Sequence, residues 1–209
     1  MFPIKRPSDS KGSSPTSPAA LSRALDWLWQ DLRAVKHPQV LDCGPPHPST
    51  IDVLLKRGAK IYITDMISLA RQAESKFIRQ LGNKRTMFLI DAFLENLLPI
   101  PSDCLSVVAC WQLFDLLPRE AHAGLVSRLW SYLNTGGVLF FLLREPSLAT
   151  GAGTRWWLES PIALRSDVES KIPFPYPAIT NREIERLFPN GSVKTFLTRF
   201  ARREILAIK

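Results

Sequence analysis

The sequence lacks the residue patterns that would indicate a metal site. Its three cysteines, Cys43, Cys104 and Cys110, form no Cys-x-x-Cys pair, and no pair of histidines or cysteines has the spacing of metal ligands. All three cysteines lie in apolar, strand-like runs, which is typical of small buried side chains in a reducing compartment. We therefore expect a cytoplasmic protein that holds no metal.

Long apolar segments and internal repeats are also absent. The longest apolar run near the end of the chain, Val138 to Leu143, is far shorter than the roughly 20 residues needed to span a bilayer. The first residues are charged and include no apolar core, so we expect neither a secretory signal nor a transmembrane segment. The 209 residues are within the size range of one domain with a single core.

No dense block of lysine and arginine is present, although 27 basic residues outnumber 19 acidic ones and give a formal charge of +8. Because the excess is spread along the chain, it favours a solvated basic surface. A contact with nucleic acid or with a membrane surface stays possible but is not favoured.

The chain divides into a tail and one domain. Residues 1–17 are rich in Ser, Pro, Gly and Lys and hold little to bury, so we expect a disordered tail. Leucines at helical spacing predict a helix over 18–36, with Ser17 as its N-cap, at the start of a domain spanning 18–209. Between 146 and 177 no periodicity is clear, and the aromatic residues there indicate an ordered lid or insert.

Short apolar runs alternate with amphipathic stretches through the middle of the chain. This alternation predicts a doubly wound α/β fold, with a mostly parallel sheet covered on both faces. Close to the end, two strands follow each other so closely that they predict an antiparallel hairpin at the sheet edge. The expected strands are 40–43, 60–66, 86–91, 104–110, 136–145, 192–200 and 202–209, and the expected later helices are 49–57, 67–81, 118–133 and 180–188.

Ligands of such sheets bind beyond the carboxyl ends of the strands. Three successive strands end on an acid, and the fourth ends on a tryptophan. Carboxylates at this edge suit a ligand that has hydroxyl groups and a cation, and they repel phosphate. The candidate cofactor-binding residues at these strand ends are Asp42, Cys43, Gly44, Asp65, Met66, Asp91, Ala92 and Trp111.

Several of these residues have a predicted role. Asp65 lies 23 positions after Asp42, where an acid accepts hydrogen bonds from both ribose hydroxyls. Asp91 and Ala92 are placed to meet an adenine edge, and Trp111 to pack on an aromatic ring or beside a sulfonium. Each also has a purely structural interpretation, as a helix cap, a turn residue or part of the core.

The turn after the first strand contains one glycine, Gly44, and three prolines, Pro45, Pro46 and Pro48. A pyrophosphate needs several glycines so that the backbone can approach it closely. An adenosyl group that carries an amino acid needs fewer, because its carboxylate can meet the helix N-terminus and its ammonium can meet Asp42. His47 lies in this turn, and we expect a surface residue rather than a catalytic one.

Taken in order, these motifs resemble those of class I S-adenosylmethionine-dependent methyltransferases. The resemblance rests on VLDCG, GAKIYITDM, LIDAF, DCLSVVACWQLFDLLPRE and LNTGGVLFFLL, and it covers about residues 20–209. It implies a seven-stranded Rossmann-like sheet whose last strand is antiparallel, and S-adenosylmethionine as the cofactor. The family usually has Gly-x-Gly after the first acid, whereas Pro46 stands here in place of the second glycine.

The resemblance implies methyl transfer to an unidentified acceptor. Methyl transfer depends mostly on alignment, so no catalytic residue is predicted. WQLFDLLP follows the fourth strand in place of the Asn/Asp-Pro-Pro-Tyr run of enzymes that methylate nucleic-acid bases, and the aromatic insert favours a small or lipid-like acceptor.

Two other classes stay open. One is a catalytically silent methyltransferase-like module that binds a partner protein, which the three prolines favour. The other is a nicotinamide-dependent oxidoreductase. The lack of a Gly-x-Gly-x-x-Gly motif and the acid-lined sheet edge argue against this class.

Overall fold

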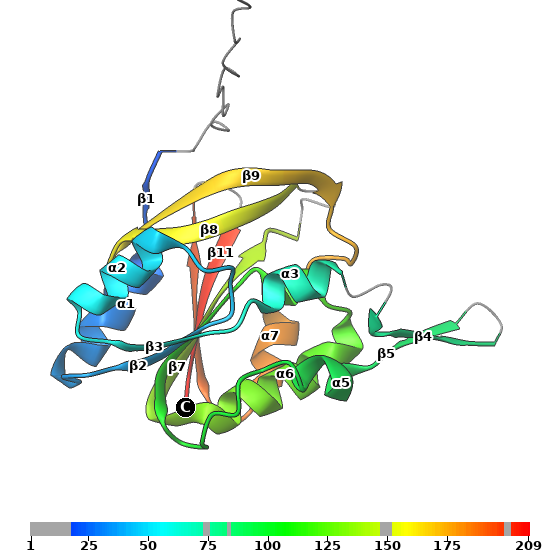
Figure 1. Cartoon of the computed structure of the whole chain (residues 1–209), viewed down its shortest axis with the longest axis horizontal. Helices are drawn as coiled ribbons and strands as arrows, with labels where there is room; N and C mark the ends of the chain where they lie inside the picture. Colours follow the sequence, from blue (N-terminus) through cyan, green and yellow to red (C-terminus); the bar gives the residue numbers. More distant parts are fainter. Residues whose placement is uncertain (1–17, 73–75, 83–84, 147–151, 199–201) are drawn as a thin grey trace, which may run out of the picture.

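A computed structural model (Figure 1) describes residues 18–72, 76–82, 85–146, 152–198 and 202–209. The expected disordered tail, 1–17, lies outside these residues. The described residues form a central six-stranded sheet in the order β10-β11-β7-β6-β2-β3. Its strands are β2 (Gln39–Asp42), β3 (Lys60–Ile63), β6 (Leu105–Trp111), β7 (Leu133–Arg144), β10 (Ser192–Leu197) and β11 (Arg202–Ile208).

Four neighbouring strands of this sheet, β3, β2, β6 and β7, run parallel, and β11 lies antiparallel to both β7 and β10. The mixed α/β class and the antiparallel hairpin at the end of the chain are therefore confirmed. In the pairing of β2 with β6, Asp42 lies opposite Ala109, two positions before Trp111. The register thus brings the last residues of these two strands to the same edge.

Helices cover both faces of the sheet. Phe140 of β7 lines a small cavity with Leu25 of α1 (Arg23–Asp31) and Leu54 of α2 (Pro48–Lys56). The next residue, Phe141, packs on Phe114 in the turn before α6 (Arg119–Tyr132) and on Phe188 after α7 (Asn181–Leu187). Successive strand residues point to opposite faces, so β7 is buried on both sides, as its continuous apolar run predicts.

The predicted third strand, 86–91, is not part of the central sheet. β5 (Arg85–Phe88) instead pairs with β4 (Ile78–Leu81) in a separate hairpin that projects from the body (Figure 1), and Ile90–Leu94 forms helix α5. Phe88 and Phe93 pack on Phe77, with ring centroids 6.4 Å and 5.4 Å away. The apolar residues of this segment are therefore buried in a local aromatic cluster, and the expectation of seven strands is wrong for the described sheet.

The helix predicted over 67–81 is also shorter than expected. The structure has α3 from Met66 to Arg71 and β4 from Ile78, while residues 73–75 of the predicted helix lie outside the described part of the chain. Phe77 is buried in the aromatic cluster, but the residues of β4 that follow it are mostly exposed. This segment therefore has no apolar face wide enough for a helix that packs on the sheet.

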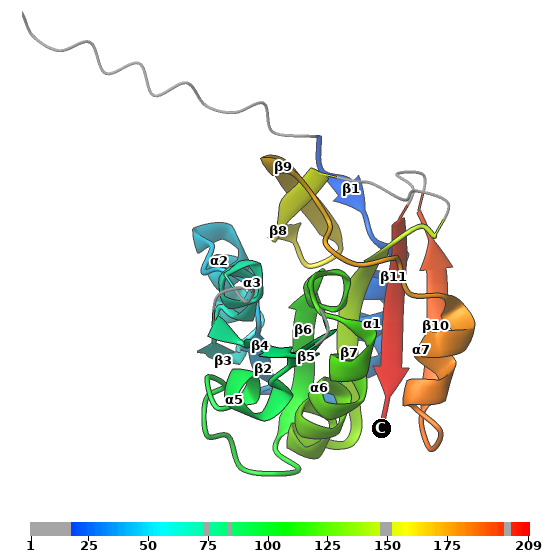
Figure 2. The same cartoon turned by 90° about the vertical axis from the view of Figure 1, so that its right-hand side faces the viewer.

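The insert predicted at 146–177 is mainly a second small sheet. β8 (Ala152–Ser160) and β9 (Ala163–Pro173) form an antiparallel hairpin, and β1 (Ala20–Leu21) pairs with the outer edge of β9. Figure 2 shows this β1-β9-β8 sheet above the central sheet, close to the upper end of β11. An ordered insert was expected, but the strand pairing within it was not.

The first helix begins later than predicted. Ser22, not Ser17, is the N-cap of α1, and its Oγ accepts a hydrogen bond from the Leu25 N–H (3.0 Å). The helix continues as the short 3₁₀ turn η1 (Leu32–Ala34). Among the described residues, no helix combines the length and the apolar composition that crossing a membrane requires.

Candidate functional site

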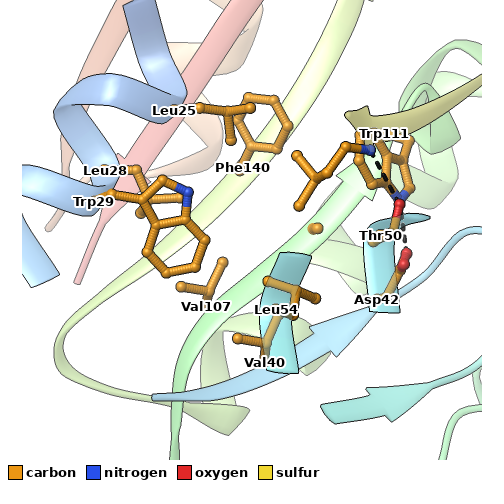
Figure 3. Close-up of a pocket in the computed structure, with 12 residues that line it drawn as sticks. Leu25, Leu28, Trp29, Val40, Asp42, Thr50, Leu54, Val107, Trp111 and Phe140 are labelled. Carbon is orange, nitrogen blue, oxygen red and sulfur yellow. Dashed lines mark hydrogen bonds between the residues drawn. The ribbon is translucent and has the colours of Figure 1, made fainter. Parts of the chain in front are cut away.

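Asp42 ends β2 and is the buried centre of the candidate site. Its Oδ1 accepts hydrogen bonds from the Gly44 N–H (2.8 Å) and from the Trp111 Nε1–H (2.6 Å), as Figure 3 shows for Trp111. Burial raises the pKa of Asp42 from 3.8 to about 6, the two hydrogen bonds oppose that rise, and the charge of nearby Asp65 adds to it. The carboxyl group of Asp42 therefore changes protonation close to neutral pH.

Trp111 ends β6 with a φ of +48°, in the left-handed region that an aromatic residue rarely adopts. Such a conformation costs about 1–3 kcal/mol and persists only where the surroundings impose it. The indole lies directly on Gly44, where a Cβ would come within 2.6 Å of Cδ1 and 2.7 Å of Nε1. Gly44 thus makes room for the tryptophan side chain of the same protein.

Asp65 follows β3 and is the N-cap of α3, because its Oδ1 accepts a hydrogen bond from the Ser68 N–H (2.9 Å). The side chain is half-buried, and it lies near enough to Asp42 to affect the pKa of that group. The structure therefore brings together three of the predicted residues, Asp42, Gly44 and Trp111, with Asp65 beside them.

Cys43 and Met66 have side chains that are fully buried in the core. A hydrogen bond with Cys110 and burial raise the pKa of the Cys43 thiol. The Met66 N–H donates to the Cys43 carbonyl oxygen (3.0 Å), which links the starts of the two turns. These two residues shape the site through their backbones.

Asp91 and Ala92 do not end a strand of the central sheet. Both lie on the short helix α5, and the Asp91 side chain is exposed. Because the segment before them pairs with β4 and not with β3, the argument that placed them at the cofactor edge does not hold.

The proline turn leads into α2, whose N-cap is His47. Its Nδ1 accepts a hydrogen bond from the Ser49 N–H (3.3 Å), and its ring stacks on Trp157 with centroids 4.5 Å apart. Burial lowers the pKa of His47, and the charge of Arg155 lowers it further. His47 is therefore half-buried with a structural role, not simply a surface residue.

The hairpin β8–β9 closes over the start of α2, and sequence analysis missed these contacts. Ser49 Oγ donates to the Leu158 carbonyl oxygen (2.6 Å), and the Leu158 N–H donates to Thr50 Oγ1 (3.0 Å). One Arg155 N–H donates to the Pro46 carbonyl oxygen (3.0 Å). The density of aromatic residues in 146–177 was the signal for a covering element, but no pattern indicated its partners.

The side chains present fit an adenosyl amino acid in kind, but the space does not fit in this conformation. Two cavities beside Trp111 measure about 20 Å³ and 10 Å³, whereas small-molecule sites measure roughly 300–1,000 Å³. Each cavity holds about one water molecule. An adenosyl amino acid is far larger than either cavity, so it could enter only after Trp111 and β8 have moved.

Within the described residues, no three His, Cys, Asp or Glu side chains lie close enough together to hold a metal ion. The sequence analysis expected no metal site because no histidines or cysteines have the spacing of metal ligands.

No protein-family model matches the chain, and no curated protein matches its sequence. Solved structures similar to it include a magnesium protoporphyrin IX methyltransferase from Synechocystis with bound S-adenosylmethionine (18% identity, 88% of this chain and 76% of the other, TM-score 0.48). A 1,6-didemethyltoxoflavin-N1-methyltransferase from Burkholderia thailandensis with bound S-adenosylhomocysteine is similar at 14% identity (90% and 79%, TM-score 0.46).

An S-adenosylmethionine-dependent methyltransferase from Methanosarcina mazei is also similar (14% identity, 83% of this chain and 93% of the other, TM-score 0.46). At these identities and TM-scores below 0.5, the likenesses assign no activity and no residue role to this chain. The chain is thus similar to solved S-adenosylmethionine-dependent methyltransferases, the class whose motifs its sequence resembles.

Proposed function

We propose that the chain binds S-adenosylmethionine where β2 and β3 end, and transfers its methyl group to a small or lipid-like acceptor. The observation that carries the proposal is the grouping of Asp42, Gly44 and Asp65 at the carboxyl ends of neighbouring parallel strands. Asp65 is suited to accept hydrogen bonds from ribose hydroxyls, and Asp42 to attract the ammonium group of the cofactor.

The described conformation is then a closed form of the site. Cofactor binding requires the Trp111 indole to leave Gly44 and its hydrogen bond with Asp42, and requires β8 to lift from α2. When bound, S-adenosylmethionine would supply an activated methyl group. The chain itself would hold and orient the cofactor and exclude water with β8.

The acceptor class rests on the chemistry of β8. Trp156 gives the hairpin an aromatic surface next to the candidate site, where it lines a small cavity with Trp111 and Pro45, whereas Trp157 is buried against His47. Such surfaces suit an apolar or aromatic acceptor better than a nucleic-acid backbone.

A second function is favoured by one specific observation, the filling of the site by Trp111. A methyltransferase-like protein that holds no cofactor would keep this side chain in place permanently, and prolines at 45, 46 and 48 would remove backbone donors that no ligand needs. This alternative predicts no binding of S-adenosylmethionine or S-adenosylhomocysteine, with or without Trp111.

We expect Asp65→Asn to weaken binding of S-adenosylhomocysteine about ten- to hundredfold, because hydrogen bonds to a charged acceptor contribute about 1.5–3 kcal/mol. Asparagine is as good an N-cap as aspartate, so α3 is preserved. Calorimetric titration measures the dissociation constant, and Asp52→Asn, at an exposed position on α2, is the matched control. An unchanged constant in Asp65→Asn would show that Asp65 does not contact the ligand.

A further inference from the structure

A separate cavity of about 560 Å³ lies between the β1-β9-β8 sheet and the edge of the central sheet formed by β11 and β10. Figure 2 shows these elements, with β1 and β8 on one side and the upper ends of β11 and β10 on the other. The volume is within the range of small-molecule sites, roughly 300–1,000 Å³. It is far larger than either cavity beside Trp111.

The cavity wall is largely apolar. Leu142 of β7, Leu164 of β9 and Phe196 of β10 line it, and Leu142 and Leu164 are almost completely inaccessible to solvent. Leu21 and Leu197 also line it, although 79% and 72% of their surfaces are exposed. Large apolar side chains gathered at one opening are typical of a ligand-binding surface, because an apolar ligand removes them from water.

Two arginines bring positive charge to this apolar cavity. Arg23 is exposed at the first position of α1, and Arg202 is half-buried at the first position of β11. The Arg202 guanidinium lies over the Trp156 ring, 4.1 Å from its centroid. Burial lowers the pKa of Arg202 to about 10, because the surroundings hydrate its charge poorly, and the charge of Asp115 opposes this only in part.

One carboxylate, Glu204, also lines the cavity. Its Oε2 accepts hydrogen bonds from Ser22 Oγ (2.9 Å) and from the Ala24 N–H (3.1 Å), so it is committed to the start of α1. Burial raises the pKa of Glu204, and its two hydrogen bonds oppose that rise. Among the described lining residues, two guanidinium groups therefore face one carboxylate that is already hydrogen-bonded to the start of α1, and this lining favours an anion.

We propose that this cavity binds a small molecule with a carboxylate head and an apolar body. The carboxylate is held by Arg202 and Arg23, because a guanidinium offers paired N–H donors that match a carboxylate. The apolar body lies along Leu21, Phe196 and Leu197, the apolar lining residues whose side chains are accessible. The arginines and leucines of this cavity take no part in the Asp42 site, although Trp156 lines both this cavity and the small one beside Trp111. The proposal stands whether or not the chain binds S-adenosylmethionine.

Titration of the full chain with decanoate tests this site, and decanol serves as the matched neutral probe. We expect decanoate to bind at least about tenfold more tightly than decanol, because only the carboxylate forms charge-assisted hydrogen bonds. Arg202→Gln is expected to weaken decanoate binding about ten- to hundredfold and to leave decanol binding unchanged. Arg33→Gln, at an exposed position on η1, is the control and is expected to bind as the wild type.

Arg23→Gln keeps the test decisive if Arg202→Gln fails to fold, because Arg23 is exposed. It is expected to weaken decanoate binding only about three- to tenfold, because the charge of Arg23 is more solvated than that of Arg202. Equal affinities for decanoate and decanol, or no binding of either, would overturn the proposal. So would full affinity in the folded arginine variants.

Tryptophan fluorescence locates the ligand. Decanoate is expected to change the emission of the wild type, and Trp156→Phe is expected to lose most of that change, because the Trp156 ring lies in the cavity wall under Arg202. An undiminished change in Trp156→Phe would place decanoate elsewhere and refute the assignment of this cavity.

Discussion

Trp111→Ala is expected to increase the affinity of the chain for S-adenosylhomocysteine about ten- to hundredfold. In the closed form the ligand must displace an indole whose Nε1–H donates to the buried Asp42 carboxyl group, and such a hydrogen bond contributes about 1.5–3 kcal/mol. The apparent affinity of a site that is open only part of the time is lowered by the open fraction. Removing the indole raises that fraction, and calorimetric titration measures the gain.

Trp111→Phe separates the hydrogen bond from the packing. Phenylalanine still fills the space above Gly44 but donates no hydrogen bond, so its gain should be smaller than that of alanine. Trp130→Phe, on α6 against Phe188 and away from Asp42, should change nothing. A loss of affinity in Trp111→Ala would mean that the indole is a wall of the open site, and no binding by any variant would favour the cofactor-free alternative.

Trp111→Ala is also expected to lower the free energy of unfolding. Truncating a large buried aromatic side chain costs about 3–5 kcal/mol, and release of the left-handed backbone at this position returns only part of that. The titrations therefore need to be made well below the melting temperature of the variant, which a thermal unfolding curve establishes.

Asp42→Asn is expected to stabilise the folded protein by about 1–3 kcal/mol at pH 8 and to have little effect at pH 4. The pKa of Asp42 rises from 3.8 to about 6 on folding, so between these values the native state keeps a proton that the unfolded chain releases. Stability falls as pH rises through this window, and the full penalty, about 3 kcal/mol at about 1.36 kcal/mol per pH unit, is present above pH 6. An uncharged asparagine avoids this penalty, and its Oδ1 can still accept the hydrogen bonds from Gly44 and Trp111.

Urea unfolding at pH 4, 6 and 8 measures this difference, with Asp52→Asn as the exposed control. The wild type and Asp42→Asn should diverge as the pH rises from 4 to 8, and the control should follow the wild type. If Asp42→Asn is instead less stable than the wild type at pH 8, the native state stabilises the carboxylate, and the assignment of a raised pKa is wrong.

The central strands could be predicted because their burial leaves a simple mark in the sequence. β2, β6 and β7 are covered on both faces, so their residues form continuous apolar runs. The predicted third strand contains a similar apolar run, Met87 to Ile90, yet Phe88 ends the hairpin strand β5 and is buried against Phe77 and Phe93. Periodicity shows that a residue is buried but not what it is buried against, and for this reason the third strand was misplaced.

The candidate site was predictable only as far as strand ends determine it. Asp42 and Trp111 are the last residues of neighbouring parallel strands, so their proximity could be expected from the fold. Their hydrogen bond could not, because it depends on a left-handed φ at a tryptophan, which no local pattern indicates.

The two faces of β8 were also hidden in the sequence. Trp156 and Trp157 are consecutive, and once they lie on a strand they must point to opposite sides. Trp157 stacks on His47 at the start of α2, and Trp156 lies under Arg202 at the larger cavity. Without a recognised strand, both tryptophans could only be assigned to the insert as a whole.

In the proposed function, Trp111 closes a site that S-adenosylhomocysteine opens. The indole N–H resonance of Trp111 reports this directly in ¹⁵N-labelled protein, where it is assigned by its loss in Trp111→Phe. We predict that the resonance moves during titration with S-adenosylhomocysteine and stops moving when the site is saturated, because the hydrogen bond to Asp42 breaks. An unchanged resonance, whether or not the ligand binds, would show that Trp111 does not close the site.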